Sequence, residues 1–198
     1  MATERSIKQK EAIRVAILEA SKTIVLKEGW QAVSIRKIAD AIGYSLPVVY
    51  NHFESKDAIL EEFVKQGFEM LSNVMLTTKG NEVEPKQQLI AMAKAYFNFA
   101  FEQREYYQMM FGLGMPSCDR VNQISEIGKF GSILIDTIQK LNHVQTVTEQ
   151  TILKFHTLWS ILHGLSSINM VNMTATPDEM QQRVLLDAVQ GFIQNIKN

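Results

Sequence analysis

The residues whose types and spacing suggest chemistry lie between Ser34 and Lys56. Helical geometry places Val49 and Phe53, four residues apart, on one face that points into the protein. The opposite face then consists of Leu46, Pro47, Val48, Tyr50 and Asn51. Exposing so much apolar surface on a short helix does not stabilise a protein, so we expect this face to meet a partner surface.

Residue sets for catalysis are missing from the sequence. There is no glycine-rich phosphate loop and no Glu-x-x-His pair for a di-iron bundle, and Cys118 lies in a Pro/Gly-rich break without a base placed beside it. His156 and His163 share a helical face, but no acidic or cysteine residue at a useful spacing completes a zinc site. We therefore expect no enzyme activity, no cofactor and no metal.

The composition indicates a folded helical protein of the cytoplasm. Of the 198 residues 46% are hydrophobic, and the apolar residues recur at helical spacing almost everywhere. The N-terminus is polar, no uncharged apolar stretch of about 18 residues follows it, and Cys118 is the only cysteine. We expect a cytoplasmic protein that makes no membrane contact.

The charge is distributed unevenly along the chain. The net charge is only -1, which by itself does not indicate a nucleic-acid binder. Residues 1–56, however, carry nine Lys and Arg against six Asp and Glu, whereas the remainder carries eleven against fifteen. The basic excess therefore lies in the same part of the chain as the exposed apolar face.

Capping and turn residues divide the N-terminal part of the chain into helices. The expected boundaries are Glu28-Gly29 at the end of the first helix, Ser34 and Gly43 around the second, Ser45 and Phe53-Glu54 around the third, and Ser55 at the start of a long fourth. The second helix, the glycine turn and the third helix have the spacing of a helix-turn-helix, whose exposed helix is free to enter a DNA groove.

The rest of the chain predicts a bundle of longer helices. We expect a linker from Thr77 to Pro85 and a break at Gly112–Cys118, where glycines and a proline interrupt the helical pattern. The predicted fold class is all-α, with a three-helix helix-turn-helix head in residues 1–54. The long fourth helix joins this head to a C-terminal helical bundle within residues 55–198.

The last two helices are predicted near residues 147–171 and 177–196. A hydroxyl and a carboxylate three residues apart are typical of a capping box at a helix start. The expected boxes are Thr146 with Glu149 and Thr176 with Glu179.

The order of residues from Ile38 to Lys56 is more specific than the bare helix-turn-helix spacing. The pattern Ile-Ala-x-x-x-Gly-Tyr-Ser-x-x-x-x-Tyr-x-His-Phe-x-Ser-Lys resembles the DNA-binding signature of the tetracycline-repressor-like (TetR) family. The preceding helix with Glu28-Gly29 also resembles the first helix of that family. The resemblance covers roughly the first quarter of the chain closely and implies a dimeric transcription regulator that binds double-stranded operator DNA.

The resemblance also assigns roles to the residues of the head. Tyr50, His52 and Lys56 match backbone-contacting positions, where a phenol, an imidazole and an ammonium donate to phosphate oxygens. Arg36 matches a position from which family members reach a guanine edge or a phosphate. Taken singly, Tyr50 could instead pack on the fourth helix, His52 could be a partly buried helix-end histidine, and Lys56 could be a solvated cation.

The base-facing positions of the recognition helix depart from the commoner residues of the family. Leu46, Pro47 and Val48 stand where polar or Gly-Thr residues are more usual, so we expect apolar contacts such as those to thymine methyl groups. The full set of expected DNA contacts is Ser34, Arg36, Ser45, Leu46, Pro47, Val48, Tyr50, Asn51, His52 and Lys56.

In the TetR family the last two helices form the dimer interface, and the sequence is compatible with a homodimer. The helix near 147–171 is apolar nearly all round, so one face can meet a partner subunit. An ordinary buried helix of a monomer is the alternative. The expected interface residues are Ser160, Gly164, Leu165, Ile168, Leu185, Ala188 and Phe192.

The helical body is also expected to hold a small apolar or amphipathic effector whose binding releases the protein, as a repressor, from DNA. Trp159, His163 and Gly164 resemble the Trp-His-Gly signature of one TetR subgroup. The histidines could contact the effector or belong to a polar cluster in the core. The expected ligand-binding residues are Phe97, Phe101, Met110, Phe111, His156, Trp159 and His163. A helical protein-interaction module without DNA binding is the alternative function.

Overall fold

A computed structural model describes residues 2–111, 124–170 and 176–196, and every regular element in these ranges is a helix. The elements are α1 (Ala2–Glu28), the 3-10 helix η1 (Trp30–Ala32), α2 (Ile35–Ile42), α3 (Leu46–Tyr50), α4 (Lys56–Gly80), α5 (Pro85–Glu102), α6 (Arg104–Phe111), α8 (Ser125–Asn142), α9 (Glu149–Asn169) and α10 (Glu179–Gln194). The all-α prediction is confirmed. The predicted break at Gly112–Cys118 lies outside the described residues.

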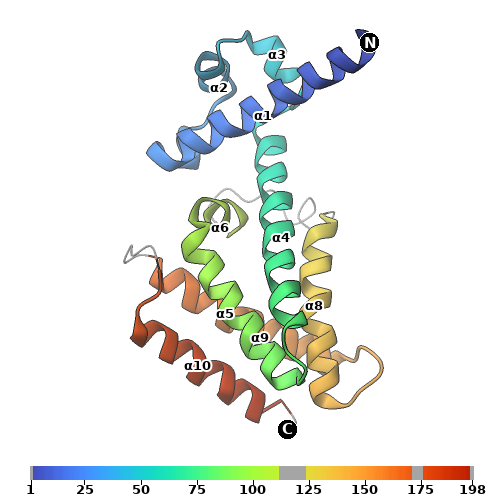
Figure 1. The fold of residues 1–198 in the computed structure, drawn as a ribbon. Helices are drawn as coiled ribbons and strands as arrows, with labels where there is room; N and C mark the ends of the chain where they lie inside the picture. The colour runs from blue at the N-terminus through green and yellow to red at the C-terminus, as the bar shows by residue number, and fades with distance from the viewer. Residues whose placement is uncertain (1, 112–123, 171–175, 197–198) are drawn as a thin grey trace.

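The head consists of α1, η1, α2 and α3 at one end of the molecule (Figure 1). Ser34 caps α2 as predicted, because its hydroxyl accepts a hydrogen bond from Lys37 N–H at 3.2 Å. Gly43 ends α2 with φ 71°, a left-handed conformation that favours glycine. Tyr44 N–H then donates to the Ala39 carbonyl at 3.0 Å, which fixes the turn into α3.

Helix α4 carries the chain from the head into the body, as Figure 1 shows. Ser55 caps it as predicted by accepting from Ala58 N–H at 3.1 Å. The helix continues to Gly80, so the prediction of a linker that begins at Thr77 is wrong. Thr77 and Thr78 donate to the carbonyls four residues earlier, at 2.9 Å and 3.1 Å, which lets these hydroxyls remain within a helix.

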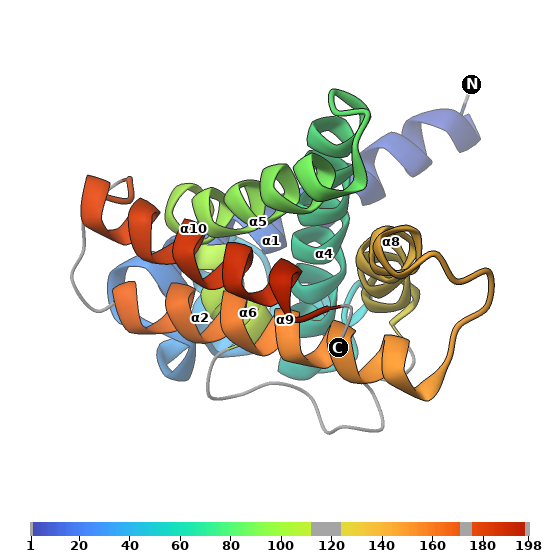
Figure 2. The same cartoon turned by 90° about the horizontal axis from the view of Figure 1, so that it is seen from below.

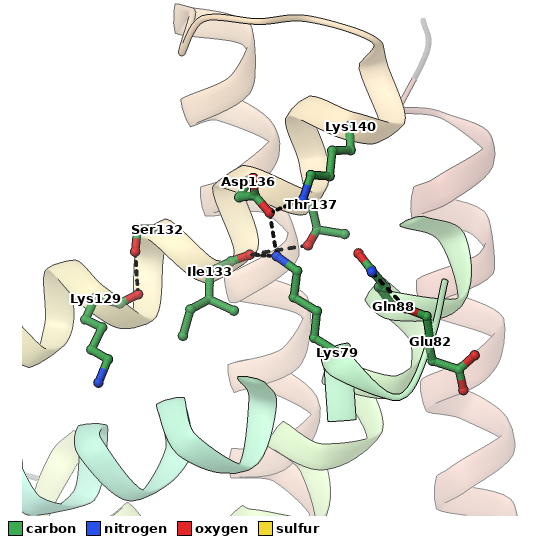
Figure 3. Close-up of polar contacts among 9 residues, drawn as sticks. All are labelled: Lys79, Glu82, Gln88, Lys129, Ser132, Ile133, Asp136, Thr137 and Lys140. Carbon is green, nitrogen blue, oxygen red and sulfur yellow. Dashed lines mark hydrogen bonds and ion pairs between the residues drawn. The ribbon is translucent and has the colours of Figure 1, made fainter. Parts of the chain in front are cut away.

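The end of α4 far from the head is fastened to α8. Figure 3 shows the Lys79 ammonium beside Asp136, with 2.5 Å between Nζ and Oδ2, and Lys140 on the same carboxylate oxygen at 2.8 Å. Burial of Asp136 works to raise the pKa of its carboxyl, but the bonds from Lys140 and Lys79 outweigh burial and lower the pKa overall. The Lys79 ammonium also lies 3.4 Å from the Ile133 carbonyl.

Aromatic rings from four helices fill the centre of the body. Phe130 of α8 is fully buried, and its ring centroid lies 5.6 Å from that of Phe68 on α4, 6.0 Å from Tyr96 on α5 and 5.5 Å from Trp159 on α9. Figure 2 shows α9 and α10 side by side along one face of this body. No described helix is long and apolar enough to cross a membrane.

The caps of the last two helices differ from the predicted ones. Thr148 caps α9, accepting from Thr151 N–H at 3.2 Å, and the Thr151 hydroxyl in turn accepts from Thr148 N–H at 3.3 Å. Asp178 and Gln181 form the equivalent box at α10. The predictions based on Thr146 and Thr176 are therefore wrong. The observed caps place Glu149 and Glu179 in the first helical turn, where the helix dipole favours a negative charge.

Helices α4 and α6 approach each other closely at Gly67. A Cβ atom added at Gly67 would overlap the Sδ and Cγ atoms of Met110, which is fully buried. The glycine therefore makes room for the methionine side chain. This contact holds α6 against the middle of α4, between the head and the Lys79 attachment.

We expect Gly67→Ala to lower the free energy of unfolding by about 1–3 kcal/mol, since Met110 has to leave its position and overpack its neighbours. Urea unfolding followed by circular dichroism measures the change. Gly128→Ala on α8 is the matched control, because a Cβ there meets nothing within 4 Å. The control gains up to about 1 kcal/mol of helix propensity. Equal effects of both substitutions would contradict the close approach.

Candidate DNA-binding surface and effector cleft

The recognition helix α3 presents a mixed outer face. Val49 and Phe53 are buried, as predicted. Tyr50 is 52% exposed and does not pack away on α4. Pro47 and Asn51 are exposed, whereas Leu46 and Val48 are half-buried, and Leu46 rests against the core of the head. The exposed apolar surface of α3 is therefore smaller than the sequence pattern predicts, because Leu46 packs partly against the core of the head.

The remaining residues of the predicted DNA surface lie in or next to α2 and α3. Ser34 and Ser45 are exposed and precede these two helices; the Ser45 hydroxyl makes no capping bond, although this residue occupies the N-cap position. Arg36 is exposed in the first turn of α2, and His52 is half-buried just after α3. Whether these side chains touch DNA stays a prediction.

Lys56 is held by a residue that the sequence did not single out. Its ammonium donates to the Trp30 carbonyl at 2.8 Å and lies 4.8 Å from the centroid of the Trp30 ring. Burial lowers the pKa of Lys56, and the nearby Asp57 carboxylate partly opposes this change. An ammonium has three donors, so others remain for a phosphate. The contact with η1 orients Lys56 at the start of α4.

The body contains a cleft of 340 Å³ between α6 and α9. This volume is at the lower end of the range for small-molecule sites. The lining residues are Arg104, Tyr107, Gln108, Phe111, His163, Ser167 and Met170.

Two of the seven predicted ligand-binding residues, Phe111 and His163, line this cleft, with their ring centroids 4.7 Å apart. Phe97, Phe101 and Met110 are buried in the core instead. His156 is exposed on the surface of α9, and Trp159 packs among the core rings. The prediction from sequence did not include Arg104, Gln108 and Ser167, the polar side chains that also line the cleft. Ser167 follows His163 by one helical turn, so the spacing could have indicated it.

A chain of hydrogen bonds leads from the core to the cleft. Tyr96 and Tyr107 are 3.1 Å apart at their hydroxyls, the Tyr107 hydroxyl is 2.8 Å from His163 Nδ1, and His163 Nε2 is 3.3 Å from the Ser167 hydroxyl. Burial raises the pKa of both tyrosines and lowers the pKa of His163. All three side chains are therefore uncharged near neutral pH.

The predicted dimer residues fall into two groups. Ser160 and Ile168 on α9 are exposed, and Gly164, Leu165 and Ala188 are half-buried. Leu185 and Phe192 are only 2% and 6% exposed and face the core of their own subunit. These two side chains are not available to a partner subunit in this structure.

Two family models match the chain. The model of bacterial regulatory proteins of the tetR family matches residues 17–69, and the model of the tetracyclin repressor-like C-terminal domain matches residues 89–189. The chain therefore belongs to the TetR family, a class of helix-turn-helix transcription regulators and not of enzymes. The resemblance to the Trp-His-Gly subgroup stays a prediction.

Two curated relatives regulate transcription in opposite directions. FasR of Mycolicibacterium smegmatis, a transcriptional activator, is 30% identical over 102 residues, which make up 50% of this chain and 45% of FasR. IcaR of Staphylococcus aureus, the negative regulator of the biofilm operon icaADBC, is 26% identical over 95 residues, 48% of this chain and 50% of IcaR. The chain thus spans about half the length of the curated relatives it matches.

A solved structure shows the fold over nearly the whole chain. FadR of Bacillus subtilis, determined in complex with stearoyl-CoA, has a TM-score of 0.68 and 13% sequence identity, over 93% of this chain and 97% of FadR. At this identity the likeness shows a shared fold.

For the head, we expect Tyr50→Phe and Lys56→Ala to weaken binding to every duplex alike, because both side chains are predicted to contact phosphates. Lys56→Ala should also reduce the slope of affinity against salt by about one unit. Val48→Ala should instead change the sequence preference. Fluorescence anisotropy on a selected operator and a scrambled duplex at several salt concentrations measures these effects.

Lys86→Ala is the matched control for the lysine, since Lys86 is exposed on α5 in the body. We expect this control to bind DNA as the unaltered protein does. An unchanged salt slope for Lys56→Ala would mean that Lys56 serves only to hold Trp30.

Proposed function

We propose that the protein is a homodimeric repressor that leaves operator DNA when a small apolar or amphipathic molecule enters the cleft between α6 and α9. The observation that carries this proposal is the double role of α6. Tyr107, Gln108 and Phe111 of this helix line the cleft, while Met110 packs on Gly67 of α4. A ligand that displaces α6 therefore acts directly on the helix that carries the head.

Tyr106 extends this connection to the head. Its hydroxyl donates to Gln66 Oε1 at 3.2 Å, and its ring lies 5.0 Å below the ammonium of Lys22 on α1. Gln66 in turn donates to Glu62 at 3.0 Å, and Glu62 pairs with Arg14 of α1 at 2.6 Å. A shift of α6 thus reaches α4 and also α1, which packs on α2 of the helix-turn-helix.

The attachment of Lys79 to α8 favours rotation of α4 over translation. This end of α4 is held by Asp136, whereas α6 contacts the helix near Gly67, closer to the head. Displacement of α6 should therefore swing the head end of α4. In a dimer, the two heads would then lose the spacing of about 34–36 Å that fits successive major grooves.

Three similar proteins bear on effector binding and on the direction of regulation. FadR was solved with an acyl-CoA, so its fold, which this chain shares, can hold an amphipathic molecule. IcaR is a negative regulator, which agrees with repression, whereas FasR is an activator. A reporter gene behind the selected operator distinguishes the two: deletion of the regulator raises expression for a repressor and lowers it for an activator.

Exposed apolar residues support a dimer through α9 and α10. Leu153 and Ile168 on α9 and Met180 and Val184 on α10 are between 44% and 71% exposed. A Cβ at Gly164 would meet nothing within 4 Å, so packing inside the subunit does not explain this glycine. We infer that a second subunit covers this surface, including Ile168, and that Leu185 and Phe192 support α10 from within.

We expect Ile168→Asp to convert the dimer to a monomer without unfolding it, because Ile168 is 71% exposed in the subunit and would be buried between two copies. Analytical ultracentrifugation gives the oligomeric state. Val83→Asp is the matched control, since Val83 is 89% exposed between α4 and α5. A monomeric unaltered protein at micromolar concentration with full operator binding would falsify the dimer.

For the release mechanism, we expect operator DNA and effector to weaken each other's binding by the same factor, roughly 5- to 150-fold. Calorimetric titration of a compound found by its ability to release DNA, with and without operator, measures this factor. Tyr106→Phe removes the bond to Gln66 and should reduce the factor, whereas Ser132→Ala, which removes an exposed hydroxyl bonded only within α8, should not. Equal effector affinities in both titrations would rule out induction.

A further inference from the structure

The described side chains that line the cleft include a cation but no carboxylate. Among the described residues that line it, Arg104 is the one permanently charged side chain, and no carboxylate accompanies it. The guanidinium makes no ion pair within the described ranges. Its Nη2 donates to the Met170 carbonyl at a long 3.4 Å. Most of its five donors therefore remain for a ligand.

Burial of Tyr96 fixes the direction of the first hydrogen bond in the chain. Tyr96 is fully buried, so its O–H needs an acceptor. Its polar neighbours are the Tyr107 hydroxyl and the Trp159 indole, and an indole N–H can only donate. The Tyr96 hydroxyl therefore donates to Tyr107. The Tyr107 hydroxyl has Ser166 and Ser167 as further hydrogen-bond neighbours, and we take its proton to point to Nδ1 of His163, 2.8 Å away.

The position of the His163 proton determines whether the Ser167 hydroxyl can donate a hydrogen bond into the cleft. A neutral imidazole that accepts at Nδ1 carries its proton on Nε2. The Nε2–H of His163 then donates to the Ser167 oxygen, 3.3 Å away. The Ser167 O–H, which neighbours Tyr107 and lines the cleft, can turn toward a ligand. Burial keeps the pKa of His163 low, so the imidazole adds no second positive charge.

We propose that the effector is an amphiphile with a single carboxylate head, bound by the Arg104 guanidinium and the Ser167 hydroxyl. Its apolar part lies against Phe111 and Met170. A carboxylate has only acceptor sites and one charge, which matches donors from one cation and one hydroxyl. This inference rests on the proposed function, because it names the class of molecule for the same cleft.

The test compares decanoate, decanol and decylamine, which share a chain and differ in the head group. Isothermal titration calorimetry on the full-length protein should give decanoate an affinity roughly 10- to 100-fold above that of decanol, from charge-assisted hydrogen bonds. Decylamine should bind more weakly than decanol, since its ammonium faces Arg104.

Three variants locate the head group. Arg104→Gln should remove the advantage of decanoate and leave decanol unchanged, and Arg104→Lys should keep part of it. Ser167→Ala should cost decanoate roughly 2- to 10-fold. Arg5→Gln, which alters an exposed arginine of α1, is the matched control and should change none of the affinities. Unchanged thermal unfolding of each variant shows that the fold is kept.

The outcomes separate this inference from the proposed function. Equal binding of decanoate and decanol, a decanoate advantage that survives Arg104→Gln, or failure of decanoate to bind overturns the carboxylate assignment. If decanol nevertheless binds and operator DNA lowers its affinity, the proposed function stands. If decanoate binds through Arg104 but operator leaves its affinity unchanged, the carboxylate site is supported and the release mechanism is overturned.

Discussion

The absence of a side chain at Gly67 allows Met110 of α6 to lie directly on the backbone of α4. Protein interiors are close-packed, so a contact of this kind does not deform gradually but moves as a unit. This packing therefore connects the cleft and the helix that lines it to the helix that carries the head. In the proposed mechanism, the DNA-binding surface and the effector site would depend on each other through this packing.

The polar contacts around α6 are too weak to couple the two sites alone. The Arg14–Glu62 pair is partly exposed, and such pairs contribute only about 0–1 kcal/mol. Useful allosteric coupling is about 1–3 kcal/mol. In the proposed release, the network from Tyr106 through Gln66 and Glu62 would direct the movement, and the packing of Met110 on α4 would supply much of its free energy.

A buried polar chain inside an aromatic core costs stability unless its members are all satisfied. Tyr96, Tyr107 and His163 satisfy one another in sequence, and the last group, Ser167, faces the cleft. The same chain that stabilises the polar groups of the core thus sets the donor character of the cleft. Specificity for a ligand head group would follow from a proton position that is determined deep in the body.

The sequence by itself determined features that depend on neighbours within about four residues. Ser34, Gly43 and Ser55 mark helix ends through local hydrogen bonds and a left-handed φ, so their roles could be predicted. The family signature from Ile38 to Lys56 is equally local. These features established the helical class, the head and the regulatory function.

Tertiary structure alone decided which apolar side chains are exposed and which polar ones meet. Leu185 and Ile168 both lie on apolar helices, and helical periodicity cannot show that the first faces its own core while the second faces outward. Arg104 and Ser167 come from α6 and α9, far apart in the chain, and they share a cleft only because the bundle brings these helices together. Long-range packing leaves no local pattern, and for this reason the cleft could not be read from the sequence.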